Sequence, residues 1–119
     1  MTALAIFLGG GMGSLLRYLT TRLGNNIGSS DFPYGTLISN IIACLLLGFF
    51  LVSLKNQIKE SAFLSNMLII GLCGGYSTLS TFSYETVNRL NSGQIGIAVL
   101  NVLLSITVCF GLIWFLLKS

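Results

Sequence analysis

The segment Gly71–Ser83, which reads GLCGGYSTLSTFS, holds most of the groups in this chain that could do chemistry. It contains three glycines and five hydroxyl side chains (Ser77, Thr78, Ser80, Thr81 and Ser83), directly after an apolar run. Backbone that leaves the helix inside hydrocarbon exposes amides and carbonyls, and it is tolerated only where protein, water or an ion completes them. A helix interrupted at this depth therefore predicts an ion site.

The composition of the chain indicates an integral membrane protein. Of its 119 residues, 54% are hydrophobic and 8% are charged, whereas about a quarter of a soluble domain is charged. Four apolar stretches of about 20 residues, the length that crosses a bilayer, fit along the sequence. We expect an all-α fold in which residues 1–119 form a single four-helix transmembrane domain, with the first helix retained and not cleaved as a signal peptide.

The inventory of reactive side chains argues against an enzyme. The chain has no histidine, and its acidic residues are Asp31, Glu60 and Glu85. General acid/base pairs, histidine-bearing metal sites and Ser/His/Asp triads are thus nearly excluded. One cysteine lies in each of three apolar spans (Cys44, Cys73 and Cys109), where packing is the expected role and redox or ligand chemistry is the alternative.

The first predicted helix runs from about Leu4 to Leu23. Its Gly9 and Gly13 form a GxxxG pair, which lets another helix approach closely in lipid. Arg17 follows inside the apolar run, where a guanidinium must extend to the interface or line a water-filled vestibule. The sequence leaves both roles for Arg17 open.

The second predicted helix runs from about Tyr34 to Leu54, after a polar connection that ends at Pro33. Asn40 is its most informative residue, because an amide within hydrocarbon needs hydrogen-bond partners. It is either bonded to a neighbouring helix or lines a pore.

The third predicted helix runs from Ala62 to Leu90, after a connection at Lys55–Ser61. A straight helix of that length would span about 43 Å, more than the membrane requires. We therefore expect an interruption over Gly74–Thr78 that shortens and kinks it, with Glu85 and Arg89 able to pair beyond the break.

The fourth predicted helix, about Ile95–Leu117, has a polar stripe at four-residue spacing: Asn101, Ser105 and Cys109. The second helix has a small and polar stripe at the same spacing (Thr36, Asn40, Cys44 and Gly48), so helices 2 and 4 can each present a polar ridge to the interrupted third helix.

The basic residues are balanced across the predicted membrane. One side holds Arg17, Arg22 and Arg89, and the other holds Lys55, Lys59 and Lys118. Because an excess of Lys and Arg on one side sets orientation, this chain is expected to insert either way up. Two opposite copies can then associate as a dual-topology antiparallel dimer.

Four segments resemble the small bacterial fluoride channels of the Fluc (CrcB) family. They are GGGMGSLLRY, PYGTLISN, GLCGGYSTLSTFSYE and the Asn101/Ser105/Cys109 stripe, and the resemblance extends over essentially the whole chain. The third of these segments, combined with Asn40, is the specific part of the resemblance.

The resemblance implies a dual-topology dimer with two fluoride pores and one structural sodium ion at its centre. The sodium would be held by backbone carbonyls of Gly74 and Ser77 in both subunits. Fluoride would pass Asn40 and two aromatic positions, and then follow a polar track on the fourth helix (Leu79 and Phe82; Asn101, Ser105 and Cys109). The implied partners are fluoride, sodium, a lipid bilayer and a second subunit, without nucleic acid, and the implied function is passive export of cytoplasmic fluoride across a bacterial plasma membrane.

The chain departs from the family pattern at three of these positions. Leu79 replaces the first of the paired phenylalanines, and it offers no positive ring edge to an anion. Asn101 stands where tyrosine is usual, and Cys109 replaces a hydroxyl with a weakly donating thiol. A related second chain that supplies the missing ring is one way to complete the pore, so the dimer is either a homodimer or a heterodimer.

Two other functions fit the sequence less well than a channel does. A small dual-topology, proton-coupled multidrug exporter would need a carboxylate deep in the first helix, which has none. A non-transporting accessory subunit explains the small-residue packing but not the hydroxyl-rich interruption. The sequence favours the channel.

Overall fold

The computed structural model describes residues 1–27, 34–77 and 79–118, and every regular element in this part of the chain is a helix. The elements are α1 (Thr2–Ile27), α2 (Tyr34–Ser53), α3 (Lys55–Glu60), α4 (Ala62–Ser65), the π-helix η1 (Asn66–Cys73), α5 (Gly74–Tyr76), α6 (Leu79–Asn91) and α7 (Ile95–Lys118). Four spans are long and apolar enough to cross a membrane: Thr2–Gly24, Tyr34–Ser53, Ala62–Asn91 and Ile95–Lys118. The prediction of an all-helical chain with four membrane spans is confirmed.

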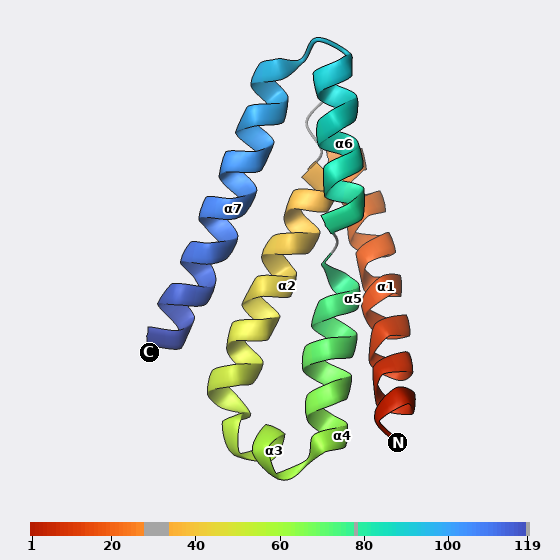
Figure 1. The fold of residues 1–119 in the computed structure, drawn as a ribbon, viewed down its shortest axis with the longest axis vertical. Coiled ribbons are helices and arrows are strands. Elements are labelled where there is room, and N and C mark those ends of the chain that lie inside the picture. The colour runs from red at the N-terminus through yellow and green to blue at the C-terminus, as the bar shows by residue number, and fades with distance from the viewer. Residues whose placement is uncertain (28–33, 78, 119) are drawn as a thin grey trace.

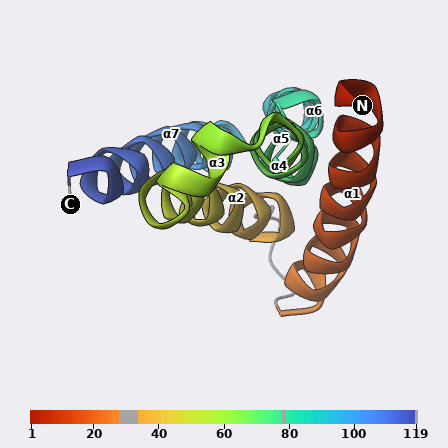
Figure 2. The same cartoon turned by 90° about the horizontal axis from the view of Figure 1, so that it is seen from below.

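The four spans run alternately up and down, so both chain ends lie at the end of the bundle opposite the α6–α7 turn (Figure 1). The chain is flattened, with extents of 50 × 30 × 22 Å. Seen from below, α1 and α7 form its two edges, and α2 and the third span lie between them (Figure 2). The third span packs against α1 through η1 and α5, but against α7 through α6. It therefore changes partners along its length.

The bundle has a small core and a large apolar exterior. The buried apolar cluster is centred on Phe50, Leu72 and Cys73. Outside it, Phe7 is 76% exposed and Trp114 is 67% exposed. Such an exterior suits contact with lipid chains and with other membrane-embedded helices, and is unlike the surface of a soluble domain.

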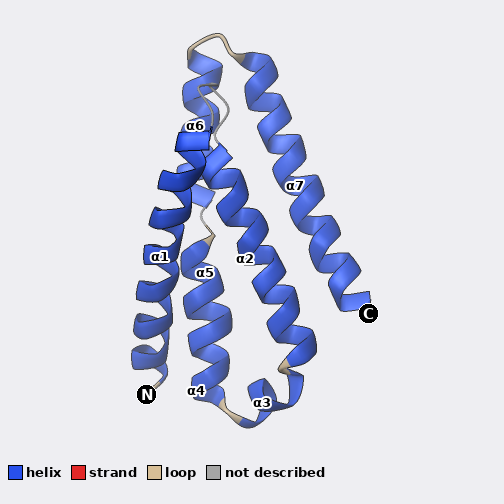
Figure 3. Cartoon of the chain, turned by 180° about the vertical axis from the view of Figure 1, so that it is seen from behind, coloured by secondary structure: helices blue, strands red, loops and turns tan. Residues whose placement is uncertain are grey.

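Two connections differ from the sequence-based expectation. The segment Lys55–Ser61, predicted as a plain connection, folds into the short helix α3, and the Ser61 hydroxyl accepts a hydrogen bond from the Leu64 amide at 3.1 Å to begin α4 (Figure 3). Helix α1 extends to Ile27, several residues beyond its expected end near Leu23. The rest of the first polar connection, including Asp31 and Pro33, lies outside the described residues.

The predicted interruption of the third span needs a correction at its start. Gly74–Tyr76 is helical and forms α5, which continues directly from η1. Ser77 then has φ −84° and ψ 154°, an extended conformation, and α6 begins at Leu79. Thr78, the last residue of the predicted interruption, lies outside the described residues. The helix does not break at the glycines, and two of them, Gly71 and Gly75, pack against the backbone of α1.

Two GxxxG pairs hold α1 against the third span. A Cβ atom on Gly9 would overlap the carbonyl oxygen of Met67, and one on Gly75 would lie 2.8 Å from the Gly10 carbonyl oxygen. Gly13 and Gly71 are equally crowded by backbone of the opposite helix, whereas Gly11 has nothing within 4 Å of its Cβ position. The close packing predicted for Gly9 and Gly13 is confirmed, and the pair Gly71–Gly75 supplies the matching surface.

Candidate functional site

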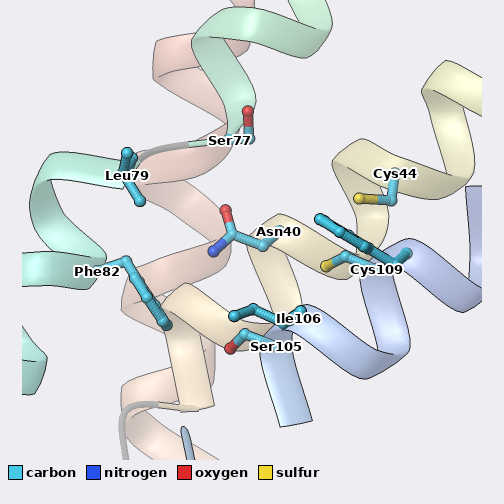
Figure 4. A pocket seen from close by; sticks show the side chains of 9 residues that line it. Asn40, Cys44, Ser77, Leu79, Phe82, Ser105, Ile106 and Cys109 are labelled. Carbon is cyan, nitrogen blue, oxygen red and sulfur yellow. The ribbon is translucent and has the colours of Figure 1, made fainter. Parts of the chain in front are cut away.

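A cavity of about 240 Å³ lies where α2, α7 and the third span meet. Its wall contains six of the residues predicted for the ion path or the sodium site: Asn40, Ser77, Leu79, Phe82, Ser105 and Cys109. Figure 4 shows Asn40 near its middle, with Leu79 and Phe82 on one side and Cys109 on the other. Residues that are far apart in the sequence thus converge on one site.

Helical periodicity explains how α2 and α7 supply this wall. Asn40 and Cys44 are four residues apart on α2, and Ser105 and Cys109 are four residues apart on α7, so each pair lies on one helix face. Helices α2 and α7 pack against each other. The two polar stripes therefore border the same space, as predicted.

The third span supplies the remaining side of the cavity at the point where it leaves the helical conformation. The extended backbone at Ser77 separates α5 from α6, and α6 then carries Leu79 and Phe82 into the wall. Leu79 is 76% exposed, which leaves it available to a neighbouring molecule. The cavity is open on this side.

Ser77 is held by its own helix. Both its amide and its hydroxyl donate to the Cys73 carbonyl oxygen, each at 3.1 Å. Gly74, the other residue predicted for the sodium site, is exposed on the surface one position before Gly75, which faces α1. Gly74 and Ser77 are thus on the same short stretch, but Gly74 does not line the cavity.

Asn101 lies behind the cavity wall and is only 2% exposed. Its amide nitrogen donates to the Thr86 hydroxyl at 3.5 Å, and its side-chain oxygen accepts from the Ser105 hydroxyl at 3.3 Å. The Thr86 hydroxyl in turn donates to the Phe82 carbonyl oxygen at 2.8 Å. This chain of bonds links α7 to α6 and fixes Ser105 next to Phe82. Thr86 was not identified from the sequence, although its spacing of four from Phe82 is a usable signal.

Two further hydrogen bonds position the halves of the third span. Tyr76 is 4% exposed, and its hydroxyl is 2.6 Å from the Thr20 hydroxyl of α1. On α6, the Glu85 carboxylate accepts a hydrogen bond from the Thr36 hydroxyl of α2. Arg89, the partner predicted for Glu85, attracts the same carboxylate electrostatically, and the buried Nε of Arg89 has no hydrogen-bond partner.

The cavity wall is neutral. Its lining offers an amide, hydroxyls, thiols and two aromatic rings, without a charged side chain among the described lining residues. Arg17, the predicted vestibule residue, lies half-buried on α1 and not in this wall. Such a surface can replace the water around a small ion without trapping it at a fixed opposite charge.

Comparison with known proteins places the chain among ion-channel relatives. The family model described as "CrcB-like protein, Camphor Resistance (CrcB)" matches residues 4–116. The chain is similar to a protein of Flavobacterium psychrophilum named "Fluoride-specific ion channel FluC", with 50% identity over 105 residues, covering 88% of this chain and 85% of the relative. A protein of the same name from Coxiella burnetii is 40% identical over 115 residues, covering 96% of this chain and 93% of the relative.

Proposed function

Because this chain belongs to the CrcB family, we propose that it is a fluoride-selective channel whose ion path runs through the cavity around Asn40. The observation that carries the proposal is the convergence of Asn40, Phe82 and Ser105 from three different spans on one neutral cavity. The chain is accordingly a multi-pass membrane protein and not an enzyme, and we place it in a bacterial plasma membrane.

The chemistry of the wall supports an anion. Fluoride is small and strongly hydrated, so a path for it must offer several hydrogen-bond donors in succession. The Asn40 amide is such a donor, the Ser105 hydroxyl would turn to the ion from its bond to Asn101, and the edge of the Phe82 ring carries positive partial charge. Weak binding at several positions allows the ion to leave as well as enter, so permeation is passive and follows the fluoride gradient out of the cytoplasm.

A second subunit in the opposite orientation completes the channel in this proposal. The cavity is open where Leu79 is exposed, and the basic residues are divided three against three between the two ends of the bundle. Balanced charge gives no preferred orientation, and oppositely inserted copies pair about a twofold axis in the membrane plane.

The central sodium ion belongs to the same proposal. The extended backbone at Ser77 directs its carbonyl away from the helical pattern, and Gly74 has no side chain to cover its carbonyl on the exposed surface. Carbonyl oxygens of these two residues from both subunits are the hard ligands that such a cation prefers. The ion would hold the two subunits together and would not take part in permeation.

A partner subunit that conducts only beside a related chain is the second candidate, and Leu79 favours it. The family's paired aromatic positions are half filled here, because Leu79 stands beside Phe82. A related chain with a ring at that position would restore the pair.

Ion efflux from liposomes that contain only this protein tests both candidates. A fluoride electrode should record rapid fluoride release, and a chloride electrode almost none. Equal rates for the two anions would reject selectivity. Silence in the wild type together with fluoride release by Leu79→Phe would identify a partner subunit, and silence in both would reject the channel.

A further inference from the structure

Cys44 of α2 and Cys109 of α7 form a pair of thiols, of which Cys109 lies on the polar stripe of the proposed ion path. Both cysteines are free and half-buried. Both line the cavity around Asn40, and both also line a second cavity of about 730 Å³ whose other wall residues come from α7. Figure 4 shows their two sulfur atoms at the same end of the first cavity, on facing helices.

The backbone holds the two thiols together. One turn beyond Cys44, a Cβ atom on Gly48 would lie 3.0 Å from the Leu116 Cβ, so α2 and α7 approach closely at this level. Cys44 and Cys109 lie next to each other on the walls of both cavities. Their separation is therefore fixed by helix packing and does not depend on a flexible loop.

The number of ligands limits what such a pair can bind. Among the described residues no group of three or more His, Cys, Asp or Glu side chains could hold a metal ion, so Cys73 does not join the pair. Structural zinc takes four ligands. Two thiolates without further ligands instead suit soft, thiophilic ions, which bind sulfur in preference to oxygen or nitrogen.

We propose that Cys44 and Cys109 form a dithiol site for soft, thiophilic metal and metalloid ions, and that an ion bound there blocks the neighbouring ion path. The block rests on the proposed function, in which fluoride passes Ser105 and then Cys109 on the polar stripe of α7. An ion bound to Cys109 would therefore stand in that path. The binding itself does not depend on that function.

Phenylarsine oxide is a suitable probe, because it is uncharged, reaches membrane-embedded sites and bridges two neighbouring thiols. Two As–S bonds form, the As–O bond breaks, and the two thiol protons leave with the oxygen as water. No oxidant or reductant is needed. The loss of protons follows the general rule that thiols bind metals and metalloids as thiolates.

Intact-mass measurement of the reconstituted protein tests the site directly. The wild type and Cys73→Ala should each take up one phenylarsenic group per chain. Cys44→Ser and Cys109→Ser should need roughly a hundredfold more reagent, because the second sulfur no longer binds intramolecularly. No adduct on the wild type, or equal uptake by Cys109→Ser, would overturn the proposal.

Fluoride efflux from the same liposomes tests the block. Phenylarsine oxide should stop efflux through the wild type and Cys73→Ala, and a small dithiol added afterwards should restore it. An adduct that forms without slowing an active channel would overturn the block. An adduct on a protein that never conducts fluoride would instead count against the proposed function and leave the dithiol site standing.

Discussion

At the scale of single residues, the proposed path depends on side chains that line the cavity and on others that hold those side chains in place. Asn40, Ser105 and Cys109 were predictable because polar groups at four-residue spacing in apolar helices must share a face. The spacing of Thr86 from Phe82 places it on the same face of α6, but its hydrogen bond to Asn101 was not predictable, because that bond depends on how α6 packs on α7. The placement of Asn101 behind the wall follows from the same packing.

Phe82→Ile is expected to reduce fluoride efflux by at least about tenfold, which corresponds to about 1.4 kcal/mol. The reason is that isoleucine fills similar space without the positive ring edge that an anion can approach. Liposome efflux measured with a fluoride electrode checks this result. Phe7→Ile is the matched control, since Phe7 is 76% exposed on α1 and does not line the cavity. Unchanged efflux in Phe82→Ile would remove the ring from the path.

At the scale of elements, the four spans could be predicted because length and hydropathy alone decide whether a helix crosses a membrane. The details of the third span could not. The glycines of Gly71–Ser83 suggest a broken helix, yet Gly71 and Gly75 face α1 while Gly74–Tyr76 remains helical. Glycine occurs both where a helix is interrupted and where two helices pack closely. Only the position of the neighbouring helix shows which of the two a given glycine does. Helix α3 was missed because its six residues include a single apolar one, Ile58, and so carry no apolar periodicity.

The GxxxG contact predicts that valine at Gly9 and valine at Gly11 lower the free energy of unfolding by different amounts. Gly9→Val should lower the free energy of unfolding by about 2 kcal/mol or more, because its side chain would overlap the Met67 backbone. Gly11→Val should change it by less than about 1 kcal/mol, because nothing lies within 4 Å of the Gly11 Cβ position. Unfolding in mixed detergent micelles measures both. Equal effects would show that α1 does not pack on the third span as described.

At the scale of the whole molecule, the even distribution of basic residues and the open cavity both bear on how two subunits would assemble. Arg89 lies in the last turn of α6 at one end, and Lys59 of α3 and Lys118 of α7 lie at the other (Figure 1). No end carries an excess of basic residues. The flat shape of the chain and its exposed apolar faces leave ample surface for a second subunit.

Dual topology predicts that about half of the copies expose α3 on each side of the membrane. Gln57→Cys places a label site on an exposed position of α3, in a background where the three native cysteines are replaced by alanine. A membrane-impermeant thiol reagent added outside intact cells should then label about half of the protein, and the remainder after permeabilisation. Complete labelling, or none, would mean a single orientation.

Fluoride passes Asn40 in the proposed path, and fluoride efflux through Asn40→Asp in liposomes at neutral pH tests this most directly. The substitution keeps the shape of the side chain but places a negative charge in a neutral cavity. Efflux should fall by at least about a hundredfold, because placing like charges together costs several kcal/mol. Asn56→Asp, on exposed α3, should conduct like the wild type. Wild-type efflux through a folded Asn40→Asp protein would contradict an ion path at this cavity.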